Sequence, residues 1–325
     1  WEENTIEASF DFAHALDLAD MDGDGDLDIV AAEMHQSERD RVTVFFNEGG
    51  GLVWRSQVLS TTGSHALRLV DIAGDGAMDI MGANWSGDYQ PLELWLNRIP
   101  QRMQRFSWPD GDWIVYPIQH ASFVMQWRDK TVFVDPVGDV DLYRNFPKPN
   151  WILLTHEHGD HLNENVIDSV SQDLTRIVAP VSVVEKLSDS NKKRTTLMAN
   201  GDRMTLDGVA IEAVPMYNQT PDRLRYHPKG RGNGYVLGLG GKRIYIAGDT
   251  EDIPEMRALR NIDVAFLCMN LPYTMTVEQA ADAVREFRPK IVYPYHSRGS
   301  DLQKFKELVG SDPGIDVRIV DWYAQ

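Results

Sequence analysis

Short apolar runs separated by polar and glycine-containing segments dominate residues 106–325. Consecutive strands are predicted at 113–120, 123–127 and 131–136, with a turn at 128–130. Strands then alternate with helices: strands at 151–155, 176–180, 209–214, 264–269 and 291–295, a hairpin at 235–239 and 242–247, and helices at 163–170, 181–188 and 277–287. The helical pattern at 277–287 is amphipathic and ends before Pro289. This order suits two packed sheets flanked by helices.

Residues 1–105 have a different pattern, an internal repeat. Residues 14–20 match residues 65–71, and the match continues through 28–29 and 79–80. Short strands between glycine-rich turns, repeating after about 50 residues, are typical of propeller blades. His14 and His65 recur at equivalent positions and are expected to be structural. Repeat folds need roughly three units to bury their faces, so we expect either part of a longer propeller or an open face that packs on the rest of the chain or on another chain, including self-association.

Each repeat carries an acidic loop. The first places alternate carboxylates in a glycine-rich segment, an arrangement that can surround one hard cation: Asp20, Asp22, Asp24, Asp26 and Asp28. The second keeps Asp71, Asp75 and Asp79, whereas Ala73 and Ala77 replace two of the carboxylates. Calcium is expected in the first loop, with a solvated acidic turn as the alternative. In the second loop, calcium would need backbone or water oxygens.

Charge separates the two parts of the chain. The formal net charge is −17, with 19 acidic and 7 basic residues in 1–106 against 30 and 25 in the remainder. This balance argues against nucleic acid as the main partner. The single cysteine, Cys268, excludes an internal disulfide and is expected to be a small buried apolar residue. No apolar stretch has the length of a membrane span, no signal peptide is visible, and residues 98–109 are expected to be a linker.

The candidate chemistry is concentrated in His156-Glu157-His158-Gly159-Asp160-His161, directly after the apolar run at 151–155. Neutral imidazole and carboxylate are the usual ligands of zinc and similar divalent metals. Asp249 and His296 also follow apolar strands. Because loops at strand ends gather side chains from distant parts of the sequence, the pattern predicts that these residues come together to bind metal.

The spacing His156-x-His158-x-Asp160-His161 resembles the metal motif of the metallo-β-lactamase-fold hydrolases. Gly248-Asp249-Thr250 and the strand-end His296 extend the likeness, which covers residues 106–325. It implies an α/β fold, the αββα sandwich of the metallo-β-lactamase type, after an N-terminal all-β domain of two propeller-like repeats at 1–105. Segments 214–218, 227–230 and 273–276 resemble a bacterial branch near the ascorbate-phosphate lactonase-like and phospholipase-D-like members. The first acidic loop resembles the calcium loop of FG-GAP/VCBS repeats.

The resemblance implies two metal sites. One takes His156, His158 and a third histidine, the other takes Asp160, His161 and His296, and Asp249 bridges them. Many members have the third histidine where this chain has Met216-Tyr217-Asn218, so His227 is the candidate, and one metal is the alternative. Asp135 is expected either to support a metal-bound histidine or to be a turn residue, and His120 to be structural or to contact substrate. Further residues are candidates for lining a substrate pocket: Tyr217, Asn218, Asn270, Tyr273 and Thr274.

The implied activity is hydrolysis of a small ester, lactone or phosphodiester by a metal-bound hydroxide, with Asp160 as catalytic residue. The implied cofactors of the hydrolase part are two transition-metal ions, which are zinc or, alternatively, manganese or iron. Calcium is the implied ligand of the repeats. A β-lactamase proper is disfavoured because Cys268 does not resemble the cysteine-ligand loop. A redox di-iron enzyme is disfavoured because His158 stands where such relatives have glutamate. The rival class is a calcium-dependent adhesion or scaffold protein, and the repeats favour a periplasmic or extracellular location.

Overall fold

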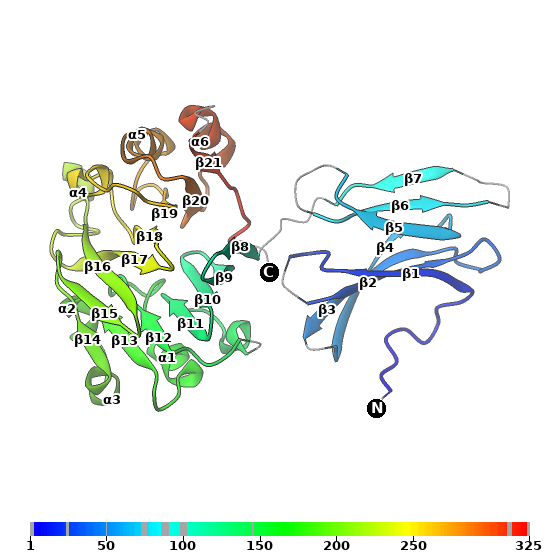
Figure 1. Ribbon diagram of the computed structural model, residues 1–325, viewed down its shortest axis with the longest axis horizontal. Coiled ribbons are helices and arrows are strands. Elements are labelled where there is room, and N and C mark those ends of the chain that lie inside the picture. Colours follow the sequence, from blue (N-terminus) through cyan, green and yellow to red (C-terminus); the bar gives the residue numbers. More distant parts are fainter. Residues whose placement is uncertain are drawn as a thin grey trace. The chain divides into compact units, whose positions relative to one another are not determined.

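The computed structural model describes residues 3–23, 26–49, 51–72, 77–85, 91–97, 103–144, 146–310 and 314–323. The chain divides into two compact units, Trp1–Gln104 and Arg105–Gln325 (Figure 1). The division lies one residue before the boundary drawn from the sequence. Among the described residues, no helix is both long enough and apolar enough to cross a membrane.

The first unit consists of two antiparallel sheets, one for each repeat. The first sheet has the order β1 (Ala13–Ala19), β2 (Asp28–Glu33), β3 (Val42–Gly49) and β4 (Val53–Ser60); the second has β5 (Ala66–Val70), β6 (Asp79–Ala83) and β7 (Leu92–Trp95). One buried cluster joins Val30, Val44 and Phe46 of the first sheet to Leu67 and Ile80 of the second. The all-β repeat architecture predicted from the sequence is therefore confirmed.

Two aspartates close the repeats in the same way. Asp28 accepts hydrogen bonds from the amides of Met21 at 2.7 Å and Asn47 at 2.8 Å. Asp79 accepts from the amides of Ile72 at 3.0 Å and Asn97 at 2.8 Å. Each carboxylate thus ties the start of its acidic loop to a residue in or just after the third strand of its repeat. Both residues, predicted as calcium ligands, have a structural role in addition.

A third buried carboxylate, Glu33, holds the end of β2. Its side chain is fully buried and accepts from the Arg41 guanidinium at 2.7 Å, the Arg41 amide at 2.9 Å and the Asp11 amide at 3.0 Å. Burial alone would raise the pKa of Glu33, but these hydrogen bonds outweigh burial and lower its pKa to about 2. The ionised carboxylate is therefore the form that the fold stabilises.

We expect Glu33→Ala to destabilise the first unit by about 3–5 kcal/mol, because the largely buried Arg41 would lose its close carboxylate partner and keep only Glu7, at 3.9 Å. Calorimetry of the full chain should show an earlier unfolding transition, whereas Glu38→Ala, at an exposed position, should leave it unchanged. The folded pKa lies below the ordinary value of 4.5, so the contribution is present above about pH 4.5 and is lost as the pH falls towards 2. Equal transitions for the two variants at neutral pH would contradict this assignment.

The second unit is built on two seven-stranded mixed sheets. The first has the order β14 (Thr195–Leu197), β13 (Arg176–Ala179), β12 (Trp151–Leu153), β11 (Lys130–Val134), β10 (Ser122–Trp127), β9 (Gly111–Gln119) and β8 (Gln104–Trp108). The second has the order β15 (Arg203–Leu206), β16 (Val209–Met216), β17 (Gly232–Leu239), β18 (Lys242–Ile246), β19 (Val264–Cys268), β20 (Ile291–Tyr295) and β21 (Asp316–Val317).

Helices cover the outer faces of the two sheets. The helical segments are η1 (Val140–Tyr143), α1 (Glu164–Val170), α2 (Val181–Val184), α3 (Asp189–Lys193), η2 (Pro221–Arg223), α4 (Pro254–Arg257), α5 (Val277–Phe287) and α6 (Leu302–Val309). The largest buried cluster includes Trp113 and Phe123 of the first sheet and Phe266 of the second. Helix α1 packs on the first sheet, and Phe287 of α5 contacts Tyr245 of the second. These layers form the predicted αββα sandwich.

Parallel pairing positions the functional residues. β11, β12 and β13 are mutually parallel neighbours, as are β18, β19 and β20. Parallel neighbours end at the same edge of a sheet, so the residues that follow these strands lie close together. Asp135 follows β11, the histidine-rich loop follows β12, and Asp249 and His296 follow β18 and β20.

The secondary structure differs from the prediction in several respects. The linker predicted at 98–109 is wrong for residues 104–108, which form strand β8 because the rings of Phe106 and Trp108 pack on Trp113. The helix expected at 181–188 is a single turn, α2, because the following residues continue as turns that close on Val183. Helix α6 was not predicted, although Asp301 caps its start and Gly310 its end. The short strands β14, β15 and β21 were also missed, because two to four residues carry little periodicity.

Candidate metal centre

The loop between β12 and α1 turns tightly so that its histidines point to one side. The amides of His161 and Leu162 both donate to the carbonyl of His158, at 2.9 and 2.8 Å. The side chain of Asn163 caps α1 directly afterwards. His156 and His161 are buried. Glu157 is not part of the cluster, because it forms an ion pair with Arg231 at 2.6 Å.

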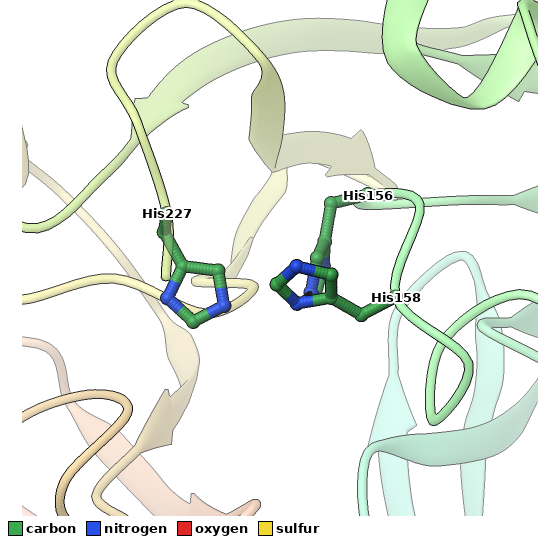
Figure 2. A group of neighbouring side chains, drawn as sticks. All are labelled: His156, His158 and His227. Atoms are coloured by element: carbon green, nitrogen blue, oxygen red, sulfur yellow. Dashed lines mark hydrogen bonds between the residues drawn. The ribbon is translucent and has the colours of Figure 1, made fainter. Parts of the chain in front are cut away.

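A first group of ligand atoms belongs to His156, His158 and His227, which lie within 4.8 Å of one another. Figure 2 shows the three rings meeting from two separate loops. Nε2 of His156 lies 3.0 Å from Nδ1 of His158. This hydrogen bond holds two candidate ligand nitrogens together, and His227 completes a group of three imidazoles, the kind of ligand that divalent zinc takes.

His227 is held in place by its other ring nitrogen. Nδ1 of His227 lies 3.3 Å from the side-chain oxygen of Asn218 and 3.2 Å from the carbonyl of Tyr273. Both partners are acceptors, so the proton resides on Nδ1 and the lone pair on Nε2. The backbone amide of Asn218 also donates to the backbone carbonyl of His227 at 2.8 Å. The structure therefore brings His227 to the position where the sequence required a third histidine.

Asp249 lies at the centre of the cluster. Its Oδ2 is 3.4 Å from Nε2 of His227 and 3.2 Å from Nε2 of His296, and its Oδ1 is 3.4 Å from Nε2 of His161. The preceding Gly248 has φ +63°, and a Cβ there would lie 2.7 Å from the Met216 sulfur. Glycine is needed at this position both for the backbone conformation and for space.

A second group contains His120, Asp160 and His296. Oδ2 of Asp160 lies 3.3 Å from Nε2 of His120 and 3.4 Å from Nε2 of His296. The Asp160 side chain is 49% exposed, whereas that of Asp249 is 3% exposed. Asp160 is thus the carboxylate of the cluster that solvent or a substrate can reach. His120 was expected to be structural or a substrate contact, and it lies directly against Asp160.

Asp135 orients His161. Its carboxylate lies 2.8 Å from Nδ1 of His161 and accepts from the amide and hydroxyl of Thr155 at 2.8 and 2.6 Å. Of the two roles expected for Asp135, the contacts match support of a candidate ligand. Asp135, His120 and His296 all have positive φ, at 43°, 54° and 43°. Non-glycine residues rarely adopt this conformation, and such strain is concentrated at functional sites.

Electrostatics favour a cation in this cluster. Burial opposes ionisation of Asp249, but His296 and His161 hold the pKa of that carboxyl well below its ordinary value. Burial would also lower the pKa of His161, yet the charges of Asp249 and Asp135 raise it well above the usual value. The pKa of His156, lowered by burial and by His161, keeps that ring neutral. The carboxylates of Asp249 and Asp135 therefore favour a positive charge in this cluster, which the His161 proton supplies until a metal ion displaces that proton.

The donor set fits a divalent metal. Nε2 of His161, His227 and His296 and Oδ1 of Asp249 are buried and lack a hydrogen-bond partner within the described part of the chain. Leaving such atoms unsatisfied costs about 1–3 kcal/mol each. A divalent ion with nitrogen and oxygen ligands would satisfy them, and its binding energy would contribute to folding.

The residues expected to line a substrate pocket have different contacts in the structure. Asn218 and the Tyr273 backbone position His227, whereas Asn270 and Thr274 hold their own loop together, with the Asn270 amide donating to the Thr274 hydroxyl at 2.7 Å. The Tyr217 hydroxyl lies 2.9 Å from Glu255. Tyr323, which contacts His120, was missed, and nothing in its local sequence indicated it.

Comparison with known proteins agrees with this fold. Residues 115–296 match the β-lactamase superfamily domain, and residues 13–82 match an FG-GAP-like repeat. A UPF0173 metal-dependent hydrolase of Pyrococcus abyssi is 32% identical over 61% of this chain and 92% of its own length. One of Thermococcus kodakarensis is 31% identical over 59% of this chain and 89% of its length.

Solved structures extend the agreement. A protein of Parabacteroides distasonis, described as a metal-dependent hydrolase, is 44% identical with a TM-score of 0.60, covering 67% of this chain and 97% of its own. The metallo hydrolase Igni18 of Ignicoccus hospitalis, 23% identical with a TM-score of 0.54, shares the fold over 65% of this chain and 95% of its own.

Fold and site together define a metal-dependent hydrolase of the metallo-β-lactamase type. The chain belongs to the β-lactamase superfamily, with the UPF0173 metal-dependent hydrolases among its relatives and an FG-GAP-like repeat at its N-terminal end. Because the match takes up 92% of the Pyrococcus relative, little of that protein remains for a counterpart of the repeat unit.

We expect Asp135→Asn to weaken zinc binding by about 10–100-fold, because His161 would lose the carboxylate that fixes its ring and increases its basicity. Competition with a chromogenic chelator measures the affinity. Asp129→Asn, an exposed position in the turn before β11, is the control and should bind zinc like the wild type. An unchanged affinity in Asp135→Asn would contradict the supporting role.

Proposed function

We propose that the second unit hydrolyses a small ester, lactone or phosphodiester and that it uses two divalent transition-metal ions. Zinc is the proposed metal, and manganese and iron are the alternatives. The observation that carries this proposal is the buried Asp249 carboxylate, which faces His227, His161 and His296 at once. One ion would be held by His156, His158 and His227, the other by Asp160, His161 and His296, with Asp249 between them. Such ions would polarise a substrate oxygen and lower the pKa of a bound water to about 7.

Asp160 is the residue proposed to handle the proton. Burial opposes its ionisation, but its contacts with His120 and His296 hold its pKa well below the ordinary value. It is therefore a carboxylate at neutral pH, and its exposed edge can orient an attacking water. The water oxygen bonds to the carbonyl carbon or phosphorus, Asp160 accepts a proton, and that proton passes to the leaving oxygen as the scissile bond breaks.

We expect Asp160→Ala to reduce turnover by at least about 10²–10⁴-fold, the range for removal of a general base, without unfolding the unit. A chromogenic panel of phosphodiester, short-chain ester, lactone and β-lactam measures turnover, and elemental analysis of the same samples counts the metals. Asp173→Ala, an exposed position beyond α1, is the control. Substantial activity in Asp160→Ala would exclude Asp160 as the proton acceptor.

For the first unit we propose calcium in the acidic loops. Ligand atoms of Asp20, Asp22 and Asp28 lie within 4.8 Å of one another. Burial, together with the charges of Asp22 and Asp20, raises the pKa of Asp28 to about 6 despite two backbone hydrogen bonds. A hard cation would relieve this repulsion. Asp26 and Asp71 are further candidate ligands, whereas Asp24 and Asp75 lie outside the described residues.

The repeat unit also supports two proposals about context. FG-GAP-like calcium repeats favour a periplasmic or extracellular location. Large apolar side chains are exposed on both sheets, Leu16 and Leu18 on β1 and Leu92 and Leu94 on β7, and these would allow self-association. A small molecule remains the proposed substrate, and the resemblance to a lactonase-like and phospholipase-D-like branch stays a prediction.

The competing function is that of a calcium-dependent adhesion or scaffold protein whose hydrolase unit binds metal without turnover, and β-lactam hydrolysis is a second alternative. The Asp20, Asp22 and Asp28 group favours the calcium part of the first alternative. The hydrolase and scaffold functions differ in their response to zinc removal, which abolishes turnover only in an enzyme. Turnover of the β-lactam in the substrate panel tests the β-lactamase alternative.

We expect calcium to raise the unfolding temperature of the first unit. At 100 times the dissociation constant, binding stabilises the folded state by about 2.7 kcal/mol, which shifts the transition of a unit of this size by several degrees. Asp22→Ala should abolish the shift, whereas Glu38→Ala should retain it. A calcium-dependent shift of equal size in Asp22→Ala would exclude this loop as the binding site.

A further inference from the structure

The C-terminal segment 314–323 reaches the candidate metal centre. The Tyr323 hydroxyl lies 2.9 Å from Nδ1 of His120. The His120 amide donates to the Trp322 carbonyl at 3.0 Å, and the His296 amide donates to the His120 carbonyl at 3.0 Å. Three segments distant in sequence are thus joined at one point, directly beside Asp160.

The Tyr323 hydroxyl accepts a backbone hydrogen bond from the Ser297 amide at 2.8 Å. The hydroxyl therefore still has its own proton to donate. The acceptor within reach is Nδ1 of His120.

The contacts at the two ring nitrogens of His120 agree on one tautomer. If Nδ1 accepts a proton from Tyr323, the neutral ring carries its own proton on Nε2. That nitrogen lies 3.3 Å from Oδ2 of Asp160. The ring therefore donates to Asp160, and one oxygen of the carboxylate is fixed by a neutral donor.

We propose that Tyr323 is a positioning residue that sets the tautomer and ring orientation of His120, and through His120 the orientation of Asp160. The backbone of His120 is pinned by Trp322 and His296, so rotation of its ring is the main freedom left. The Tyr323 hydroxyl removes that freedom, because a flipped ring would lose the hydrogen bond to Nδ1. Outer contacts of this kind fix ligands and increase their affinity for metal.

The inference rests on the proposed role of Asp160, but the tautomer can be tested on metal-free protein without any substrate. The full chain is labelled with ¹⁵N-histidine, and His120 is assigned with a His120→Gln sample. In the wild type, the ¹⁵N shifts should show a proton on Nε2 and none on Nδ1. A proton on Nδ1 of His120 would overturn the proposal, whether or not the protein is a hydrolase.

The variant test compares Tyr323→Phe with Tyr116→Phe, whose hydroxyl binds Gln126 within the first sheet. Removal of the Tyr323 hydroxyl should convert His120 to a mixture of tautomers and weaken binding of the second zinc ion by about 10–100-fold, with the first ion retained. Tyr116→Phe should match the wild type in both measurements. An unchanged tautomer and an unchanged second-ion affinity in a folded Tyr323→Phe would overturn the proposal, and the wild-type spectrum decides the matter if that variant does not fold.

Discussion

The buried carboxylate of Asp249 is the constraint around which the second unit is built. An ionised carboxylate in an apolar interior is unfavourable unless opposite charges or hydrogen-bond donors surround it. Here the compensation comes from imidazoles on three separate loops, His161, His227 and His296. The fold must therefore hold each ring in a defined position beside the carboxylate. Strands that run parallel and end at one edge meet this requirement, because a short loop after each strand has little freedom.

Support for the imidazoles comes from outside the cluster. Asp135 fixes His161, while Asn218 and the Tyr273 carbonyl fix His227. In each case the acceptor takes the proton of Nδ1 and leaves Nε2 directed inward. The same logic explains the strained backbone at Asp135 and His296: packing and hydrogen bonds around these residues offset the cost of positive φ.

The sequence predicted the parts of this arrangement that are local. The spacing from His156 to His161, the strand before His296 and the helix at 277–287 are patterns within a dozen residues, and the described structure contains each of them. The third histidine required knowledge of where a loop folds back, since His227 follows its strand by many residues. The roles of Asn218 and Tyr273 depend on a contact between two loops 55 residues apart. Tyr323 contacts a histidine 203 positions away, and no local pattern encodes such a contact.

A comparison of the two acidic loops distinguishes aspartates with a structural role from aspartates that are candidate ion ligands. Asp28 and Asp79 occupy equivalent positions and accept equivalent pairs of backbone hydrogen bonds. Asp22 and Asp26 of the first loop correspond to Ala73 and Ala77 of the second. The carboxylate that closes the repeat is thus present in both, and its loss would remove two hydrogen bonds to backbone amides. A carboxylate whose main partner is a cation has no such structural role, so a repeat can lose it while its sheet is still closed by the remaining aspartate.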